Sequence, residues 1–516
     1  MVDLERPYVL AVDIGTTSTK TLIVDRKGAV HAAHSVEYPL YTPKPDRAEQ
    51  DPEQIYRAVL KGIRAVLEKK GLSGKDILCV SFSSAMHSLL AVDRNHRPLT
   101  NCITFADNRS TEYVRLLREK YDGHRIYLNT GTPIHPMSPL LKLMWMKDHE
   151  PEVFATAYKF IGIKEYVFAR LFGTYVVDYS IASATGLFNL ESLAWDEQAL
   201  AAAGITPERL SEPVNTTHIV TGMNAEAVRE TGLLADTPFV VGASDGVLAN
   251  LGIGAIDPGV YAVTIGTSGA VRGVVRKPVT DPEGRLFCYA LHQDYWVIGG
   301  AINNGGIMLR WVRDQLATLE AKQAADMGED AYDYFSRLAD EVPAGSDGLI
   351  FLPLLAGERA PYWNADARGV FFGLNLYHQK KHMIRAVMEG VMYRIRSVTE
   401  ALTNVTGQKP REMRASGGFA RSLMWRQMMA DVLATDVSIP ESIESSGTGA
   451  AKLGLLAVGA IKDLGETSGW VKTVDTHRPR AQESSVYERL YPIYMDVYLR
   501  LREPFRKIAA FQREQG

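Results

Sequence analysis

Apolar residues occur along the chain in short runs that are each ended by small polar residues. The first such pattern covers residues 8–25, where two apolar runs flank a turn of small residues, Gly15, Thr16, Thr17 and Ser18. Asp13 lies near the end of the first run, and Lys20 opens the second. Two β-rich runs joined by such a turn predict a β-hairpin. The amides and hydroxyls of the turn are suited to an anion. Because an unpaired carboxylate at the end of a buried strand is costly, Asp13 indicates a hydrated cation.

A second copy of this pattern occurs at residues 259–275, with Gly266, Thr267 and Ser268 in the turn. Two phosphate-binding hairpins far apart in one chain predict two similar domains that face each other across a nucleotide. The sequence has no GxxxxGK[ST] loop, which excludes a P-loop, and no GxGxxG opens a helix in a βαβ unit.

The remaining pattern predicts an α/β protein with mixed sheets covered by helices. Strands are expected at 30–38, 77–84 and 88–93, and a helix capped by Asp51 follows the first of them. Further helices are expected at 137–149, 378–406 and 447–460, and the C-terminal amphipathic helix is expected to be interrupted at Pro504. We place the domains at 1–254 and 255–460, followed by a helical tail at 461–516.

Composition narrows the classes of partner. The chain has 516 residues, 46% hydrophobic and 23% charged, with a net charge of −3, values typical of a globular protein that does not bind nucleic acid or anionic lipid. No apolar run approaches a membrane span, and no leader pattern opens the sequence. Three scattered cysteines without a CxxC pair indicate reduced thiols in a cytoplasmic protein. We therefore expect a small-molecule substrate.

Polar residues at strand ends are the candidate ligand-binding positions. Met86 and His87 follow the strand at 77–84, although a lone histidine here is more often structural. Asp107 and Arg109 follow another apolar strand, where they form either a structural ion pair or a bracket for a polyhydroxylated substrate. Asp245 follows a buried strand, where it is either the N-cap of a helix or a carboxylate facing a cleft.

Two glycine pairs mark the second half of the chain. Asn304, Gly305 and Gly306 precede a helix, and Gly417 and Gly418 follow a short strand. A helix that begins at the second pair has N-terminal amides suited to an adenosine or a phosphate.

Together these motifs resemble the FGGY carbohydrate kinases, which belong to the actin-like ATPase superfamily. DIGTTSTK and TIGTSGAV match the two phosphate loops, ASGGFARS resembles the adenosine segment, and GASDG resembles the segment with the catalytic aspartate. MSPLLKLMWMKDH and GVFFGLNLYHQKKHMIRAVME are similar to the two family signatures. The resemblance covers residues 8–460 and implies two RNase H-like domains with a ligand cleft between them.

The resemblance also implies roles for the candidate residues. Asp245 is expected to be the general base, and Asp13 is expected to hold Mg²⁺ through coordinated water. ATP and its phosphates are expected at Gly15, Thr16, Thr17, Ser18, Lys20, Gly266, Thr267, Ser268, Asn304, Gly306, Gly417 and Gly418. Sugar selection is expected at Met86, His87, Asp107, Arg109 and Asp245. The resemblance leaves a homodimer open.

Within the family, SFSSAMHSLLAVD, PLTNCITFADNRS and ASATGLFNL are most similar to the gluconate kinases. The expected reaction is phosphorylation of the terminal hydroxyl of a sugar acid, D-gluconate to 6-phosphogluconate. A carboxylate needs a cationic or amide-rich partner, for which Lys164, Arg109 and His87 are candidates. Xylulose kinases share the Met-His pair but usually have glycine where this chain has Ser88. A kinase for xylulose or another ketose or polyol is the first alternative, and an actin-like ATPase acting on proteins is a distant one.

Overall fold

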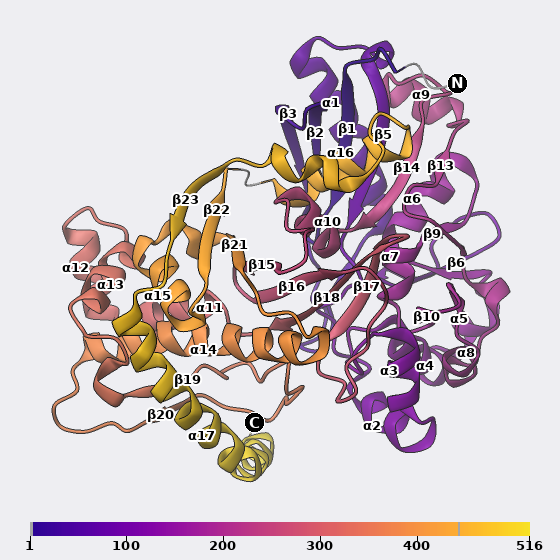
Figure 1. The fold of residues 1–516 in the computed structure, drawn as a ribbon. Helices are drawn as coiled ribbons and strands as arrows, with labels where there is room; N and C mark the ends of the chain where they lie inside the picture. The colour runs from indigo at the N-terminus through magenta and orange to yellow at the C-terminus, as the bar shows by residue number, and fades with distance from the viewer. Residues whose placement is uncertain (1–3, 442–443, 516) are drawn as a thin grey trace. The chain divides into compact units, whose positions relative to one another are not determined.

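The structure is a computed structural model that describes residues 4–441 and 444–515 (Figure 1). It divides into two compact units that are each discontinuous in sequence. The first contains Met1–Asp257, Val274–Ile298 and Glu444–Val471, and the second contains Pro258–Gly273, Gly299–Ile443 and Lys472–Gly516. The predicted domain bounds at 254/255 and 460/461 stay a prediction.

The first unit contains a six-stranded mixed sheet in the order β13-β14-β5-β1-β2-β3. Its strands are β1 (Tyr8–Ile14), β2 (Ser18–Asp25), β3 (Val30–Glu37), β5 (Ile77–Ser84), β13 (Ile219–Val220) and β14 (Phe239–Ser244). Strands β1 and β2 form the predicted antiparallel hairpin. Strand β1 also pairs in parallel with β5, and β5 pairs in parallel with β14. The three parallel strands therefore end at the same edge of the sheet.

Helices cover both faces of this sheet, and the alternation along β1 decides which residues face which layer. Leu10 and Val12 pack in one core with the apolar face of α1 (Pro52–Lys70). Val9 and Ala11 pack in the other core with α10 (Asp245–Gly252) and α16 (Ser445–Ala457). Asp13 continues the odd-numbered series, so it points to the α10 and α16 side.

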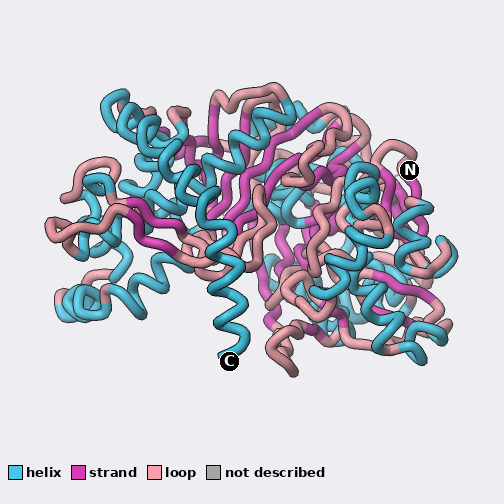
Figure 2. Tube along the Cα trace, turned by 90° about the horizontal axis from the view of Figure 1, so that it is seen from below, coloured by secondary structure: helices cyan, strands magenta, loops and turns pink. Residues whose placement is uncertain are grey.

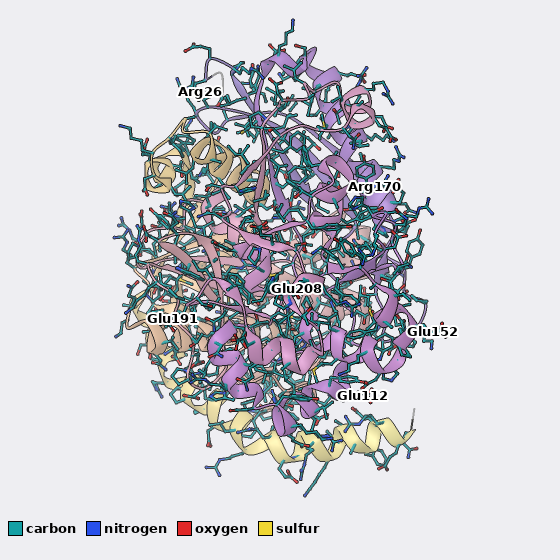
Figure 3. All side chains as sticks on the ribbon, turned by 90° about the vertical axis from the view of Figure 1, so that its right-hand side faces the viewer. Arg26, Glu112, Glu152, Arg170, Glu191 and Glu208 are labelled. Carbon is teal, nitrogen blue, oxygen red and sulfur yellow. The ribbon has the colours of Figure 1, made fainter. Side chains whose placement is uncertain are left out.

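Shorter elements of the first unit surround the sheet. The additional helices are α2 (Thr111–Lys120), α3 (Gly123–Thr130), α4 (Pro139–His149), α5 (Pro151–Thr156), α6 (Ile163–Phe172), α7 (Tyr179–Ser183), α8 (Glu197–Ala203) and α9 (Ala225–Thr231). Two-stranded pairs are formed by β4 (Glu49–Gln50) with β7 (Cys102–Ile103), β6 (Leu90–Val92) with β8 (Lys159–Ile161), β9 (Val176–Asp178) with β12 (Glu212–Val214), and β10 (Phe188–Asn189) with β11 (Ala194–Trp195). Charged side chains such as Glu112 and Glu152 are exposed on the outside of this unit (Figure 3).

The second sheet repeats the hairpin pattern, with the strand order β17-β18-β16-β15-β21-β22-β23. Its strands are β15 (Val260–Ile265), β16 (Gly269–Val275), β17 (Phe287–His292), β18 (Tyr295–Ile302), β21 (Glu412–Ser416), β22 (Asp436–Pro440) and β23 (Thr473–His477). Strand β15 pairs antiparallel with β16 and parallel with β21. The helices of the second unit are α11 (Ile307–Trp311), α12 (Thr318–Asp326), α13 (Ala331–Asp340), α14 (Lys380–Thr406), α15 (Leu423–Leu433) and α17 (Ala481–Gln515), and β19 (Ile350–Leu352) pairs with β20 (Val370–Phe372).

The expected interruption of the C-terminal helix at Pro504 is wrong. Helix α17 is continuous from Ala481 to Gln515 with Pro492 and Pro504 inside it, as Figure 2 shows. A proline removes one helical hydrogen bond and can bend a helix without ending it. The helix buries aromatic residues on both sides of Pro492 and Phe505 just after Pro504, so packing offsets the lost hydrogen bonds. The region before α17 is not all helical, because residues 473–477 form β23.

None of the described helices has an apolar stretch long enough to cross a membrane. The three cysteines are free thiols in buried positions. The cytoplasmic location remains a prediction.

Glycines bring α10 and α16 into close contact. A Cβ added at Gly449 would lie 2.1 Å from the carbonyl oxygen of Leu248 in α10. We expect Gly449→Ala to lower the free energy of unfolding by about 2 kcal/mol or more through overpacking. In an exposed helix interior the same substitution would stabilise by about 0.5–1 kcal/mol. Thermal denaturation measures whether Gly449→Ala stabilises or destabilises the protein. Gly469→Ala is the control, because a Cβ at Gly469 meets open space. An unchanged or raised Tm for Gly449→Ala would contradict the close packing.

Glu165 is a buried carboxyl group at the start of α6, where Oε2 accepts a hydrogen bond from the Gly162 amide at 2.5 Å. Burial raises the pKa of Glu165 to about 7 from an ordinary value of 4.5. The folded state therefore holds a proton that the unfolded chain releases between these pH values, and stability falls as the pH rises through this window. A shift of this size corresponds to roughly 3 kcal/mol.

We expect Glu165→Gln to remove this slope, because glutamine does not ionise. The Tm difference, variant minus wild type, should increase from pH 5 to pH 8 when both are measured by differential scanning fluorimetry. Glu68→Gln, at an exposed glutamate of α1, is the matched control and should follow the wild type. A difference for Glu165→Gln that is constant or decreases with pH would show that burial does not control this group.

Candidate functional site

The ends of β1, β5 and β14 bring three predicted site segments to one edge of the first sheet. In the strand register, Asp13 of β1 pairs with Ser83 of β5, and Ser83 pairs with Ala243 of β14. Beyond this row, β5 leads into Met86 and His87, and β14 leads into Asp245. Segments separated by more than 200 residues therefore meet because parallel strands end together.

Asp13 has one oxygen bound and one without a partner. Its Oδ2 accepts a hydrogen bond of 2.6 Å from the Ser446 hydroxyl at the start of α16, whereas its buried Oδ1 has no hydrogen-bond partner among the residues that the structure describes. The adjacent Lys20 pairs with Glu444 at 2.9 Å. Sequence reasoning missed Ser446 and Glu444 because they lie more than 420 residues along the chain from the hairpin and belong to no local motif.

Hydrogen bonds to the backbone hold the turn of the first hairpin in place. The Gly15 amide donates to Ser18 O at 2.9 Å, and the Tyr38 hydroxyl donates to Gly15 O at 2.8 Å. Gln50 donates to the carbonyl of Thr16 at 2.6 Å. The side chains of Thr16, Thr17 and Ser18 do not supply these bonds, which leaves the turn shaped by its surroundings rather than by its own hydroxyls.

Asp245 is the first residue of α10, and its N-cap is Ser244. The interpretation of Asp245 as the N-cap is therefore wrong, because the helix begins at Asp245 itself, one residue earlier than that role requires. The half-buried carboxylate accepts a hydrogen bond from the Gly246 amide at 2.7 Å. The N-terminus of a helix favours the ionised form of such a carboxylate.

Lys164 lies below this edge and is buried. Its Nζ is 2.6 Å from Asp178 Oδ2 and donates to Ala243 O, two residues before Asp245, at 3.3 Å. Burial lowers the pKa of Lys164, and the charges of Asp178, Glu165 and Asp245 oppose that shift. Lys164 is thus engaged by carboxylates of the protein itself, which argues against its serving as the partner of a substrate carboxylate.

Met86 and His87 occupy the corner after β5. Met86 packs against the core on the α10 and α16 side of the sheet. The His87 ring donates from Nδ1 to the carbonyl of Ala184 at 2.6 Å, and its backbone carbonyl accepts from Lys142 at 2.6 Å. His87 has φ of 66°, the left-handed conformation that is uncommon for residues other than glycine.

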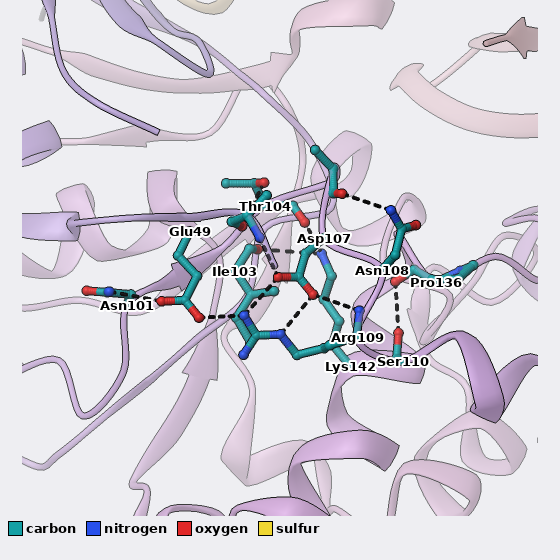
Figure 4. A network of polar contacts seen from close by, with 12 residues as sticks. Glu49, Asn101, Ile103, Thr104, Asp107, Asn108, Arg109, Ser110, Pro136 and Lys142 are labelled. Atoms are coloured by element: carbon teal, nitrogen blue, oxygen red, sulfur yellow. Dashed lines mark hydrogen bonds and ion pairs between the residues drawn. The ribbon is translucent and has the colours of Figure 1, made fainter. Parts of the chain in front are cut away.

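Asp107 and Arg109 form a buried ion pair at 2.8 Å (Figure 4). Asp107 also accepts a hydrogen bond from the Ala48 amide at 2.8 Å, and Arg109 pairs with Glu49 at 2.5 Å. Burial lowers the pKa of Arg109, but the hydrogen bonds and charges of Asp107 and Glu49 outweigh it and raise that pKa overall. Of the two interpretations, this geometry favours the structural ion pair, and direct substrate contact stays a prediction.

In the second unit, the turn after β15 packs against the glycine pair at 305–306. The Gly306 amide donates to Gly266 O at 2.7 Å, and a Cβ at Gly306 would lie 2.6 Å from that oxygen. Gly266, Thr267 and Ser268 are exposed. The side-chain amide of the buried Asn304 bonds to the backbone of Gly357 at 2.7 Å and of Ala356 at 3.1 Å, so its observed role is to brace that loop.

Gly417 and Gly418 lead into a 3₁₀ helix (Gly418–Arg421) rather than directly into an α-helix. Gly417 has φ of 95°, and a Cβ there would lie 2.5 Å from Ile265 O, just before the second hairpin turn. Helix α15 begins at Leu423, where Ser422 accepts from the Trp425 amide. The helical structure expected after the glycines is present as a 3₁₀ helix at Gly418–Arg421, which α15 follows. A cavity of about 620 Å³ adjoins this segment, lined by Asp333, Ser336, Arg337, Asp340, Arg421, Ser422, Leu423, Met424, Gln427 and His477.

Known proteins place these features in one family. Residues 8–252 match the N-terminal domain, and residues 261–458 the C-terminal domain, of the FGGY family of carbohydrate kinases. The gluconokinase of Bacillus licheniformis is 49% identical over 506 residues, which is 98% of both chains. Two structures from Lactobacillus acidophilus, described as a gluconate kinase and a ligand-bound xylulose kinase, are each 37% identical, with a TM-score of 0.92 over 97% of this chain and 99% of theirs. The chain belongs to the FGGY family of carbohydrate kinases.

Proposed function

We propose that this chain transfers the terminal phosphoryl group of ATP to the terminal hydroxyl of D-gluconate, which gives 6-phosphogluconate. The observation that supports the choice of sugar most strongly is the 49% identity to a gluconokinase over nearly the whole of both chains. The structures at 37% identity carry both sugar names, so they support a sugar kinase without choosing between the two.

Asp245 is the proposed general base. Its half-buried carboxylate stands at the N-terminus of α10, at the same sheet edge as Asp13 and the Met86–His87 corner. The helix N-terminus suits a carboxylate that accepts the proton of the attacking hydroxyl. The oxygen then forms the new bond to phosphorus as the bond to ADP breaks.

Asp13 suits a magnesium ion. Mg²⁺ keeps several waters and needs only one or two carboxylates together with substrate phosphates. The described residues contain no group of three or more His, Cys, Asp or Glu side chains arranged around a metal position, which agrees with this mode rather than a site made wholly by the protein. The partnerless Oδ1 of Asp13 supplies an acceptor for a coordinated water. When bound, the ion would neutralise charge on the phosphates.

The proposed phosphate ligands are the two exposed or half-buried turns and the glycine pair that supports the second of them. The preformed first turn requires little ordering on binding, because Tyr38 and Gln50 already hold its carbonyls. The cavity beside Ser422 has the volume of a small-molecule pocket, which supports binding of the nucleoside near Gly417 and Gly418.

The sugar is proposed to contact Met86 and His87, with Asp107 and Arg109 beside them. Arg109 and Lys164 already pair with carboxylates of the protein. The His87 ring bonds through Nδ1 to a neutral backbone carbonyl, and we propose it as the partner of the gluconate carboxylate. A homodimer stays a prediction.

We expect a coupled ADP-release assay to give a kcat/KM for gluconate at least about tenfold above those for xylulose, ribulose and glycerol, because buried polar groups reject a ligand that leaves them unpaired. A reaction with enzyme and ATP but no sugar measures the background hydrolysis of ATP. Activity confined to a neutral sugar would replace gluconate as the substrate, and turnover independent of any sugar would contradict the kinase proposal.

We expect Asp245→Asn to fold and bind ATP but to lose about 10²- to 10⁴-fold in kcat, because asparagine cannot accept the proton. Steady-state kinetics with gluconate and a thermal shift with ATP measure the two effects. Asp236→Asn is the matched control. Asp236 is an exposed aspartate just before the N-terminal end of β14, the strand that leads into Asp245. Near-normal turnover of Asp245→Asn would remove Asp245 from this role.

A further inference from the structure

A lysine is buried in an apolar helix beside the corner that carries Met86 and His87. Lys142 lies in α4 with zero exposed surface, and its neighbours from Leu140 to Met146 are all buried. Burying an ammonium group is costly unless it is hydrogen-bonded. Burial lowers the pKa of Lys142 to about 7, and the charge of Asp107 opposes that shift. Such a residue needs a compensating role in the fold or the site.

The hydrogen bonds of Lys142 are all to backbone carbonyls. Its Nζ donates to His87 O at 2.6 Å, to Thr104 O at 2.7 Å and to Ile103 O at 3.5 Å. These carbonyls belong to the two segments that carry the proposed sugar contacts, one at Met86–His87 and the other leading into Asp107–Arg109. Figure 4 shows Lys142 beside the second of these segments.

The His87 contact has particular weight because of the backbone conformation there. A non-glycine residue with φ of 66° is uncommon, and its surroundings must hold it in that conformation. Two bonds do so, one from Lys142 to the carbonyl and one from the ring to Ala184. Loss of the first would let the corner relax toward the commoner backbone conformation and move the ring.

Helix α4 also contacts the segment that carries Asp107 and Arg109, through Trp145, which lies about one helical turn after Lys142. The ring of Trp145 lies 5.0 Å from the guanidinium carbon of Arg109, within cation–π range. Arg109 in turn binds Asp107 and Glu49. Lys142 and Trp145 thus contact the two segments from a single helix, at positions three residues apart on one face.

We propose that Lys142 is a positioning residue for sugar selection, which acts by holding the carbonyls of His87 and Thr104 so that the two sugar-contacting segments keep one fixed arrangement. This inference rests on the proposed function, since it assumes that these segments contact the sugar.

The test compares Lys142→Met with Lys452→Met. Lys452 is a second buried lysine that donates to backbone carbonyls, those of Leu251 and Gly252 at the C-terminal end of α10, at 3.0 and 3.3 Å. We expect Lys142→Met to raise the KM for the sugar about tenfold or more, with a smaller change in kcat and a KM for ATP within about twofold of the wild type. Lys452→Met should lower Tm without this selective change.

Lys142→Arg keeps the charge and the donors, and we expect it to fold and to restore part of the sugar KM. If Lys142→Met does not fold, Lys142→Arg is measured instead. We then expect its KM for the sugar to be at least about threefold above the wild type, with an unchanged KM for ATP. An unchanged sugar KM, or equal changes in both KM values, in the folded variant would overturn the inference. The assay uses the sugar that the wild type prefers, so failure of the gluconate proposal and failure of the Lys142 proposal are separate outcomes.

Discussion

The parallel pairing of β1, β5 and β14 is the constraint on which the candidate site depends. Parallel strands share one direction, so the residues that follow them are delivered to one edge. Asp13, His87 and Asp245 come from three separate stretches of sequence, and the register alone aligns Asp13 with Ser83 and Ala243. A shift of one residue in β1 would turn Asp13 toward the α1 side and away from α10 and α16.

Around this edge, several buried charged groups have partners that the protein supplies. Lys142 binds carbonyls, Lys164 binds Asp178, and Asp107 binds Arg109 and the Ala48 amide. Buried networks of this kind are rigid because every member loses much if one bond is broken. In contrast, Oδ1 of Asp13 and the hydroxyl of Ser83 are buried without hydrogen-bond partners.

The hairpin plus a parallel neighbour occurs twice, once in each sheet. Thr264 of β15 pairs with Ser416 of β21 in the register that Asp13 and Ser83 occupy in the first sheet. Thr264 and Ser416 share a hydrogen bond of 3.0 Å between their hydroxyls, whereas Asp13 supplies a charge. The two copies therefore share a backbone arrangement and differ in chemistry, which agrees with the proposal that Asp13 binds the metal.

The sequence by itself determined the elements whose periodicity or turn chemistry is strong. Both hairpins, the strand at 77–84 and the helix after Asp51 follow from local pattern, because each depends on residues near one another in the chain. Tertiary structure decided the rest. Tertiary packing keeps α17 continuous at Pro504. The fold also places Ser446 beside Asp13, although more than 420 residues separate them in the chain. It also paired Asp107 with Arg109 and Glu49, since burial rather than spacing selects the partners of a charge.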